Sequence, residues 1–168
     1  GYTPAHINVI TEACKNRGLS DTDNVVWKYA IPEDETCKTA IEDCIDQGCT
    51  LVFTNSYGHQ DYAKTAAEQN PNVDIVAMTG DTAKKSNLSN FHNAFTKIYE
   101  ARYVAGVVAG LKINQLKEEG KLTDKNMKDG KVKVGYVGAY AYAEVISGYT
   151  AFFLGIQSVC PDVTMDVL

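Results

Sequence analysis

The stretch that decides the fold is Leu51-Val52-Phe53-Thr54-Asn55-Ser56-Tyr57-Gly58-His59-Gln60-Asp61. It begins as a short apolar strand that ends at Thr54, and a polar turn and the start of a helix follow. Ligands bind at the carboxyl ends of strands in parallel α/β sheets, because turn amides and short polar side chains meet there beside a helix N-terminus. The stretch therefore predicts one of two things: an ordinary strand-to-helix turn with a Ser or Asn cap, or a ligand-binding edge.

Strands and helices alternate on both sides of this stretch. Apolar runs and turn residues predict strands over 24–31, 49–54, 74–78, 91–96, 131–137 and 163–168. Helical spacing predicts helices over 4–17, 33–47, 58–69, 97–116 and 141–158, with a polar loop over 82–90. The nearly unbroken apolar run 49–54 is typical of a strand buried on both faces. This alternation predicts an α/β fold, a parallel sheet with helices on both faces.

The helix expected over 97–116 carries a face of small residues. A small side chain lets another backbone approach closely, and in a soluble helix this usually means tight packing on a sheet. The residues of this face are Ala101, Ala105, Gly106, Ala109 and Gly110.

The order of the elements predicts two lobes, both incomplete. The chain opens on a helix, without the strand that should come before it, and a long charged connection follows the helix 97–116. We expect residues 1–116 to form a first lobe lacking its first strand, residues 117–130 to be the connection, and residues 131–168 to form the first βα unit and the next strand of a second lobe. Such a fragment exposes apolar edges, so we expect it to self-associate or to complete its sheet in trans.

Composition excludes some classes of protein. The 168 residues carry a net charge of −5, which argues against a nucleic-acid binder, because such proteins neutralise phosphates. No apolar run approaches the roughly 20 residues that span a bilayer. No signal peptide is recognisable, and the opening Gly1-Tyr2-Thr3-Pro4 resembles a boundary more than a natural start.

The five cysteines show no paired spacing. None has the CxxC pattern of a zinc or redox site. Cys37 and Cys44 fall on one helix face two turns apart, roughly 10 Å by helix rise, which is too far for an undistorted disulfide. Buried free thiols are therefore expected.

Neither a cofactor nor a metal ion is expected. Gly135-Tyr136-Val137-Gly138 follows a strand, but it lacks the third glycine of a dinucleotide-binding turn and the Lys-Ser/Thr of a P-loop. His6, His59 and His92 do not have the spacing of metal ligands. His59 and Asp61 at one helix start can be a catalytic pair, although the sequence shows no nucleophile for them.

Several segments together resemble the basic membrane protein (BMP) family, from one end of the chain nearly to the other. The opening Gly1–His6 resembles that family's G-W-N-x-A-H, and Phe53–Asp61 resembles F-A-T-S-F-G-Y-M-D. Asn70-Pro71-Asn72-Val73 resembles Y-P-D-V, and Tyr99–Gly110 resembles Y-E-G-R-Y-V-A-G-V-I-A-G, the most specific match. The segments within 134–155 resemble I-G-Y-V-x-x-F-P-I-P-E-V-I and N-A-F-T-L-G.

The resemblance implies a lipid-anchored, extracytoplasmic substrate-binding protein of an ABC importer, with the type I periplasmic-binding-protein fold and no enzymatic activity. It is strongest to purine and purine-nucleoside binding members, in which two lobes close on the ligand. Tyr2 then matches an aromatic position that stacks on the base, worth roughly 1–3 kcal/mol. The other implied ligand-binding residues are Thr3, His6, Thr54, Asn55, Ser56, Tyr57 and Gly58 on the first lobe, and Tyr140 and Glu144 on the second.

Departures from the family pattern keep other functions open. Tyr2 replaces Trp or Phe, Thr3 replaces Asn, and Asn55-Ser56-Tyr57 replaces Thr-Ser-Phe. The phenolic groups of the tyrosines can form hydrogen bonds where the family only stacks. A binding protein of the same fold for a sugar or a signalling molecule is one alternative. A flavodoxin-like or nucleoside-processing enzyme that uses His59 and Asp61 is the other.

Overall fold

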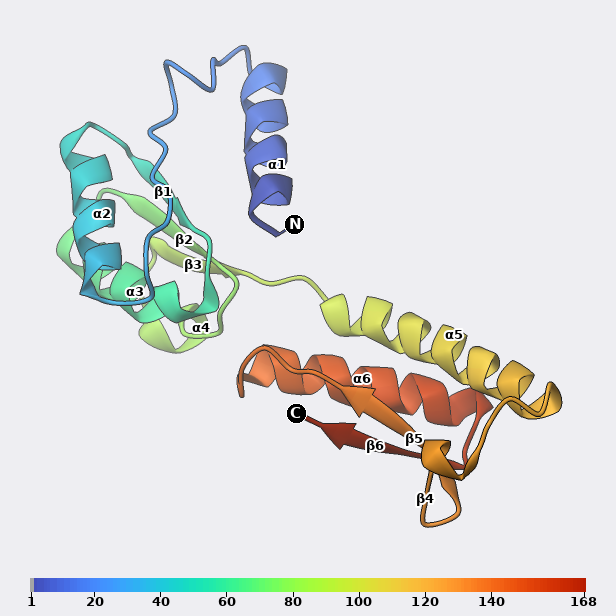
Figure 1. Cartoon of the computed structure of the whole chain (residues 1–168). Helices are drawn as coiled ribbons and strands as arrows, with labels where there is room; N and C mark the ends of the chain where they lie inside the picture. Colours follow the sequence, from blue (N-terminus) through green and yellow to red (C-terminus); the bar gives the residue numbers. More distant parts are fainter. Residues whose placement is uncertain (1) are drawn as a thin grey trace. The chain divides into compact units, whose positions relative to one another are not determined.

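The structure is a computed structural model that describes residues 2–168, with the side chain of Tyr2 left out of the description. The chain forms two compact units, Gly1–Thr96 and Lys97–Leu168 (Figure 1). We expected the first lobe to reach residue 116, but the helix that follows Thr96 packs with the second unit.

The first unit contains a parallel sheet of three strands in the order β1-β2-β3. Thr54 of β1 pairs in register with Ala77 of β2, which pairs with Asn93 of β3. The expected alternation of strands and helices is confirmed over most of this unit. Its elements are α1 (Tyr2–Asn16), α2 (Glu35–Asp46), β1 (Leu51–Thr54), the 3₁₀ turn η1 (Tyr57–His59), α3 (Gln60–Gln69), β2 (Asp74–Met78), α4 (Ala83–Ser86) and β3 (Phe91–Ala94).

The core of the first unit lies between the sheet and the helices α2 and α3. Small residues of α3 let this helix lie close to β2. Burial of this apolar surface is the main source of stability of the unit. The fully or nearly buried residues are Cys37, Ile41, Cys44, Val52, Ala63, Ala66, Ala67, Val73, Ile75, Ala77 and Phe91.

The predicted strand over 24–31 is wrong. Residues 25–29 have no regular secondary structure and pair with no strand among the described residues, and Ala30 turns the chain with φ of 54°. The β-forming side chains of Val25, Val26 and Trp27 are half-buried all the same. A strand needs a hydrogen-bonded neighbour about 4.8 Å away, and this segment has none; Lys28 and Tyr29 instead line a cavity together with residues of β1.

Strand β1 is buried on one face and exposed on the other, so the expectation of burial on both faces is also wrong. Val52 and Thr54 are buried, whereas Leu51 and Phe53 are 51% and 47% exposed. Within the first unit α2 and α3 lie on the side of Val52, and β1 contacts α2 there. An apolar run alone does not reveal that only one face is covered.

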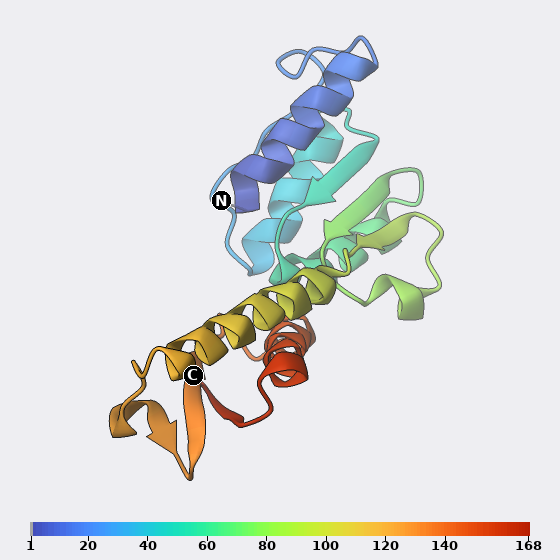
Figure 2. The same cartoon turned by 90° about the vertical axis from the view of Figure 1, so that its right-hand side faces the viewer.

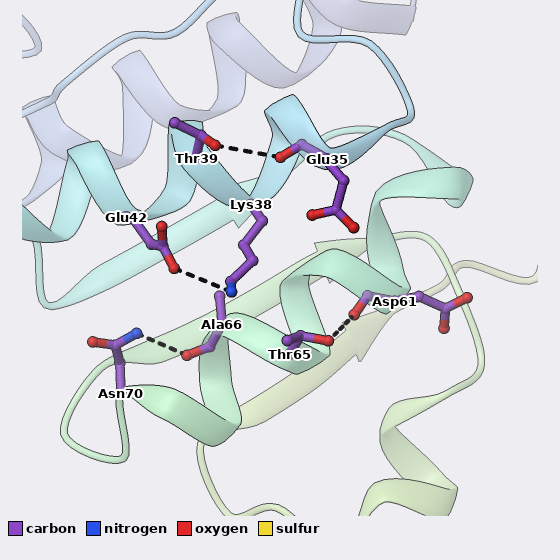
Figure 3. A network of polar contacts seen from close by, with 8 residues as sticks. All are labelled: Glu35, Lys38, Thr39, Glu42, Asp61, Thr65, Ala66 and Asn70. Carbon is purple, nitrogen blue, oxygen red and sulfur yellow. Dashed lines mark hydrogen bonds and ion pairs between the residues drawn. The ribbon is translucent and has the colours of Figure 1, made fainter.

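The polar faces of α2 and α3 are held by contacts within each helix (Figure 3). In α2, Lys38 pairs with Glu42, four residues on, at 3.5 Å. In α3, the hydroxyl of Thr65 donates to the carbonyl of Asp61 at 3.0 Å. An ion pair of the Lys38–Glu42 spacing stabilises its helix by a few tenths of a kcal/mol, whereas the Thr65 contact only satisfies the hydroxyl.

The second unit contains two strands in parallel and a short antiparallel hairpin. β5 pairs in parallel with β6, and β4 pairs antiparallel with β5. The charged segment 117–130 is therefore partly structured: it holds the end of a helix, a 3₁₀ turn and β4. The elements are α5 (Ile98–Glu118), η2 (Asp124–Asn126), β4 (Met127–Lys128), β5 (Lys131–Tyr136), α6 (Ala143–Val159) and β6 (Val163–Val167).

Helices α5 and α6 pack backbone against backbone, and they lie side by side in both views (Figures 1 and 2). A Cβ placed on Gly106 of α5 meets the carbonyl oxygen of Phe152 at 2.0 Å. A Cβ on Gly155 of α6 meets the carbonyl oxygen of Tyr103 at 2.1 Å. The small-residue face of α5 thus packs tightly, as expected, but on a helix and not on a sheet.

The outer surface of α5 is apolar over one stripe. Val104 and Val108 are each 61% exposed, and Leu111 is 55% exposed. This apolar stripe does not make α5 a membrane helix: among the described helices, none combines the length and the apolar character that crossing a bilayer requires. The buried core of the second unit is Val132, Ile156, Cys160 and Val163.

Candidate functional site

The polar residues that follow β1 gather at the rim of a cavity of about 320 Å³ in the first unit. Thr54 ends the strand, and Asn55 and Ser56 form the turn after it. Thr3, in the first turn of α1, lines the same cavity, and its hydroxyl accepts a hydrogen bond from Asn55 Nδ2 at 3.4 Å. The fold therefore brings together four of the residues that the sequence suggested for ligand binding.

Two polar atoms at this rim have unused hydrogen-bonding capacity. Thr54 Oγ1 and Asn55 Oδ1 are buried and have no hydrogen-bond partner among the described residues. Thr54 as a whole is only 6% exposed. Buried polar atoms in folded proteins nearly always have a hydrogen-bond partner, because a buried polar atom without one costs about 1–3 kcal/mol. Such atoms at the carboxyl end of a strand indicate a place where another molecule or segment supplies a donor.

Glu33 holds the turn after β1, and the sequence did not suggest this role. Its carboxylate accepts hydrogen bonds from the hydroxyl of Ser56 and from the backbone N–H of Gly58, the latter at 3.0 Å. We expected Glu33 to be the first residue of a helix, but Asp34 is the N-cap of α2 and accepts from Thr36 N at 2.9 Å. Glu33 thus lies before the helix and is able to reach across to the turn.

Gly58 lies against the carboxylate of Glu33. A Cβ on Gly58 comes within 2.4 Å of the Glu33 carboxyl carbon. We expected Gly58 to leave room for another group to approach the backbone, and the group that approaches it is this carboxylate.

Gln60 fixes the neighbouring loop after β2, and this role too was missed. Gln60 is buried, and its Oε1 accepts from Asp81 N at 2.8 Å and from Thr82 N at 3.1 Å. The phenol of Tyr57 donates to Asp81 Oδ1 at 3.4 Å, and partial burial raises the pKa of Tyr57, so its hydroxyl is protonated at neutral pH. A glutamine in the first turn of an apparently ordinary helix gives no sequence signal for this contact.

His59 has a structural partner. It is buried, and its Nε2 lies 3.2 Å from the carbonyl oxygen of Ile31, with which it makes a hydrogen bond. Asp61 is exposed in the first turn of α3. His6 is half-buried on α1, one turn after Thr3. The proposed catalytic pair is thus one buried imidazole bound to backbone and one carboxylate on the surface.

The remaining suggested residues fall elsewhere. The side chain of Tyr2 lies outside the described part of the chain. Tyr140 and Glu144 belong to the second unit, where Tyr140 stacks on Tyr142 with ring centres 5.3 Å apart, and Glu144 lies in the first turn of α6.

The cysteines are free thiols, and three of them are buried. Cys37 lines the cavity from α2, where burial raises its pKa from 9.0 to about 12. The charges of Asp34 and Glu33 act in the same direction. This thiol is therefore neutral and unreactive at physiological pH. Across the described residues, no three His, Cys, Asp or Glu side chains gather as a metal site would require.

Comparison with known proteins gives a family for the chain. The family model described as "ABC transporter substrate-binding protein PnrA-like" matches residues 9–167. The chain is also 29% identical, over all its 168 residues, to a purine-binding protein of Brucella abortus (strain 2308). It spans 42% of the length of that relative.

Solved structures share the fold at lower identity. An ABC transporter solute-binding protein from Conexibacter woesei matches 98% of the chain and 48% of its own length, with a TM-score of 0.61 and 18% identity. A transcriptional activator of the comK gene from Bacillus halodurans matches 94% of the chain and 46% of its own length, with a TM-score of 0.62 and 18% identity. Both likenesses support the α/β fold with a parallel sheet.

Proposed function

The chain belongs to the PnrA-like family of ABC transporter substrate-binding proteins, and from this premise we propose that it binds a purine base or nucleoside for a membrane importer. The protein carries out recognition and no chemistry. It works outside the cytoplasm, and its partners are the small ligand and an ABC transporter permease. Family membership supports the binding role, and the name of the Brucella abortus relative supports the purine.

The observation that carries the proposal is the pair of unsatisfied atoms at the end of β1. Thr54 Oγ1 and Asn55 Oδ1 offer acceptors that the described residues leave unused. Purines carry ring N–H or exocyclic NH₂ donors, and nucleosides add ribose hydroxyls. One such donor at this rim supplies the missing hydrogen bond and relieves a desolvation cost of about 1–3 kcal/mol.

The turn is also held in place before a ligand arrives. Glu33 fixes Ser56 and Gly58, and Gln60 fixes the loop that contains Asp81. A site whose groups are already positioned loses less conformational entropy when it binds. The same polar groups suit a sugar, so a sugar or a signalling molecule stays the competing ligand class.

The test is a thermal-shift panel on the protein at its full natural length. Adenosine, guanosine, inosine, hypoxanthine, ribose and glucose are compared at equal concentration. A ligand at a hundred times its dissociation constant stabilises the native state by about 2.7 kcal/mol, which moves the melting temperature measurably. We expect shifts with the purines only. If only ribose or glucose raised the melting temperature, the ligand would be a sugar and not a purine. If no compound in the panel raised it, the proposed binding role would be contradicted.

Variants connect the binding to the site. Asn55→Ala removes an acceptor at the rim, and Tyr2→Ala removes the aromatic ring that the family resemblance assigns to stacking. We expect each to weaken purine binding by roughly tenfold or more. Asn72→Ala is the matched control, because Asn72 is an exposed asparagine of the turn before β2. If Asn55→Ala and Asn72→Ala bound purines with equal affinity, the ligand would not bind at this rim.

A further inference from the structure

Helix α2 ends in a tight turn that leads the chain into β1. The backbone N–H of Gly48 donates to the carbonyl of Ile45 at 2.8 Å. The backbone N–H of Cys49 donates to the carbonyl of Cys44 at 3.1 Å. Gly48 has a φ of 90°, in the left-handed region that favours glycine. These two hydrogen bonds around a left-handed glycine make up the Schellman motif, a common end of helices.

The Schellman motif frequently brings two side chains into contact. They belong to the residue that accepts the longer-range hydrogen bond and to the residue that donates it, and both are usually apolar. At the end of α2 both are cysteines, Cys44 and Cys49. Cys44 is 7% exposed, and the half-buried Cys49 packs against the core cluster to which Cys44 belongs. The helix end therefore holds a pair of thiols.

The backbone hydrogen bond limits the distance between the two cysteines. With standard bond lengths, the N···O distance of 3.1 Å keeps the Cα atoms of Cys44 and Cys49 within about 7 Å of one another. Disulfides join residues whose Cα atoms are about 4.4–6.8 Å apart. Burial raises the pKa of Cys44, and the charge of a Cys49 thiolate adds to this effect, so the two sulfurs are electrostatic neighbours.

The two thiols differ in their access to solvent. Cys49 is half-buried and can be reached by a small reagent, whereas Cys44 is nearly enclosed. Lys28, which forms an ion pair with Asp43, lies near enough for its charge to lower the pKa of Cys44 against the effect of burial. An accessible thiol beside a second, resolving thiol is the arrangement of redox-active cysteine pairs.

We propose that Cys44 and Cys49 form a reversible disulfide that ties the end of α2 to the start of β1. The oxidant is a small disulfide, represented by oxidised glutathione. The thiolate of Cys49 attacks one sulfur of the oxidant, whose S–S bond breaks and releases one small thiol. The thiolate of Cys44 then attacks the Cys49 sulfur, and the second small thiol leaves. Two electrons pass from the protein to the oxidant, and the two protons of the cysteines end on the released thiols.

The bond would hold the base of the candidate site. β1 begins at Leu51, two residues after Cys49, and its other end carries Thr54 beside Asn55. A cross-link at this point restrains the fraying of α2 and of the first residues of β1. The proposed location outside the cytoplasm supplies conditions in which disulfides persist. The bond depends on the geometry of the helix end, however, so it is tested without any ligand and separately from the proposed function.

The experiment oxidises the purified protein at its full natural length in glutathione buffers of increasing oxidised fraction. Trypsin then releases the peptide 39–64, which contains Cys44 and Cys49 and no other cysteine. We expect this peptide to lose the mass of two hydrogen atoms. A second cleavage, before Asp46, separates the two cysteines, and the two pieces should stay joined until dithiothreitol is added.

The end of α1 provides a matched internal control. It has the same turn, in which the N–H of Leu19 donates to the carbonyl of Cys14 at 2.9 Å and Gly18 has a φ of 70°. Because leucine stands opposite Cys14, this cysteine should stay reduced or take up glutathione, and should form no disulfide within the chain. In the variant Cys49→Ser, the enclosed Cys44 should stay reduced in every buffer.

Amide hydrogen exchange measures the effect of the bond. The amides of Cys49 and Val52 should exchange roughly tenfold or more slowly in the oxidised protein than in the reduced protein. The amides of α5, in the second unit, should be unchanged. Cys49→Ser should show no difference between the two buffers, and circular dichroism checks that this variant is folded.

Three results would overturn the proposal. In the first, peptide 39–64 carries glutathione on its cysteines in every oxidising buffer and never forms the internal bond. In the second, Cys49 is joined to Cys37 or Cys14 in place of Cys44. In the third, the bond forms but leaves the exchange at the end of α2 and in β1 unchanged, which would mean that it ties nothing together.

Discussion

The side-chain oxygen Oε1 of Gln60 accepts a hydrogen bond from the backbone N–H of Asp81 at 2.8 Å, and this contact joins the start of α3 to the loop after β2. Gly80, just before Asp81, makes the approach possible. Its φ is 121°, and a Cβ there would lie 2.4 Å from the same Gln60 oxygen. One buried amide thus shapes the loop beside the candidate site.

Replacing Gln60 with methionine should destabilise the first unit. Met is close to Gln in size but accepts no strong hydrogen bond, so the N–H groups of Asp81 and Thr82 lose their partner. We expect a loss of about 2–4 kcal/mol in the free energy of unfolding, from urea titration followed by the fluorescence of Trp27, the single tryptophan. Gln69→Met, at the exposed end of the same helix, should change it by less than about 0.5 kcal/mol. Equal effects of the two variants would contradict the role given to Gln60.

Replacing Gly155 with alanine should force α5 and α6 apart. The new methyl group would lie 2.1 Å from the Tyr103 carbonyl oxygen, and backbone atoms cannot move aside as a flexible side chain does. We expect the second unit to lose about 1–3 kcal/mol or more, seen as faster amide hydrogen exchange throughout both helices. Gly135→Ala is the control, since a Cβ at this position in β5 meets no atom within 4 Å. Unchanged exchange in Gly155→Ala would mean that the two helices lie further apart.

Replacing Glu33 with alanine should loosen the turn after β1. The Gly58 N–H loses its acceptor at 3.0 Å, and the Ser56 hydroxyl loses the same carboxylate. Hydrogen bonds to charged groups contribute about 1.5–3 kcal/mol, so the Gly58 amide should exchange roughly 10- to 100-fold faster. Glu35→Ala, two residues away in the first turn of α2, should leave that amide unchanged. Slow exchange of Gly58 in both variants would rule out the Glu33 contact.

The stability of the first unit should fall at alkaline pH through Cys37. Its thiol releases a proton near pH 9 when unfolded and near pH 12 when folded, because burial disfavours the thiolate. Between these values the unfolded state binds fewer protons, so the free energy of unfolding decreases by up to about 1.4 kcal/mol per pH unit.

Urea titrations of the parent chain and of Cys37→Ala at pH 8, 9, 10 and 10.5 measure this slope. The variant should lose stability less steeply above pH 9, because Lys28 and Tyr57 titrate in both proteins and cancel in the comparison. Parallel curves would show that Cys37 titrates normally in the folded chain.

Local patterns were enough to predict most elements of the fold. The strand Asp74–Met78 has the predicted bounds, because it is an apolar run with a turn at each end. The local pattern around Trp27 predicted a strand equally well, but these residues do not form one. A β-strand is a property of two segments, and the presence of the second cannot be read from the first.

The sequence was enough to predict which residues form the turn after β1. It was not enough to predict the side-chain contacts that hold this turn and its neighbouring loop in place. The position of Thr54, Asn55 and Ser56 follows from where a strand stops, which apolar residues reveal. Glu33 and Gln60 reach the site from other parts of the chain, through single side chains whose neighbours in sequence give no sign of it. Contacts between polar side chains and distant backbone depend on the folded geometry alone.

The division into two separately packed cores has a consequence for how this sequence changes over generations. The buried residues of Gly1–Thr96 and those of Lys97–Leu168 form distinct clusters. Free-energy changes at sites that share no neighbours add, whereas those at touching sites do not. Substitutions around Ile75 and around Ile156 should therefore accumulate without masking or aggravating one another. A substitution that compensates for another should therefore occur in the same core cluster, within Gly1–Thr96 or within Lys97–Leu168.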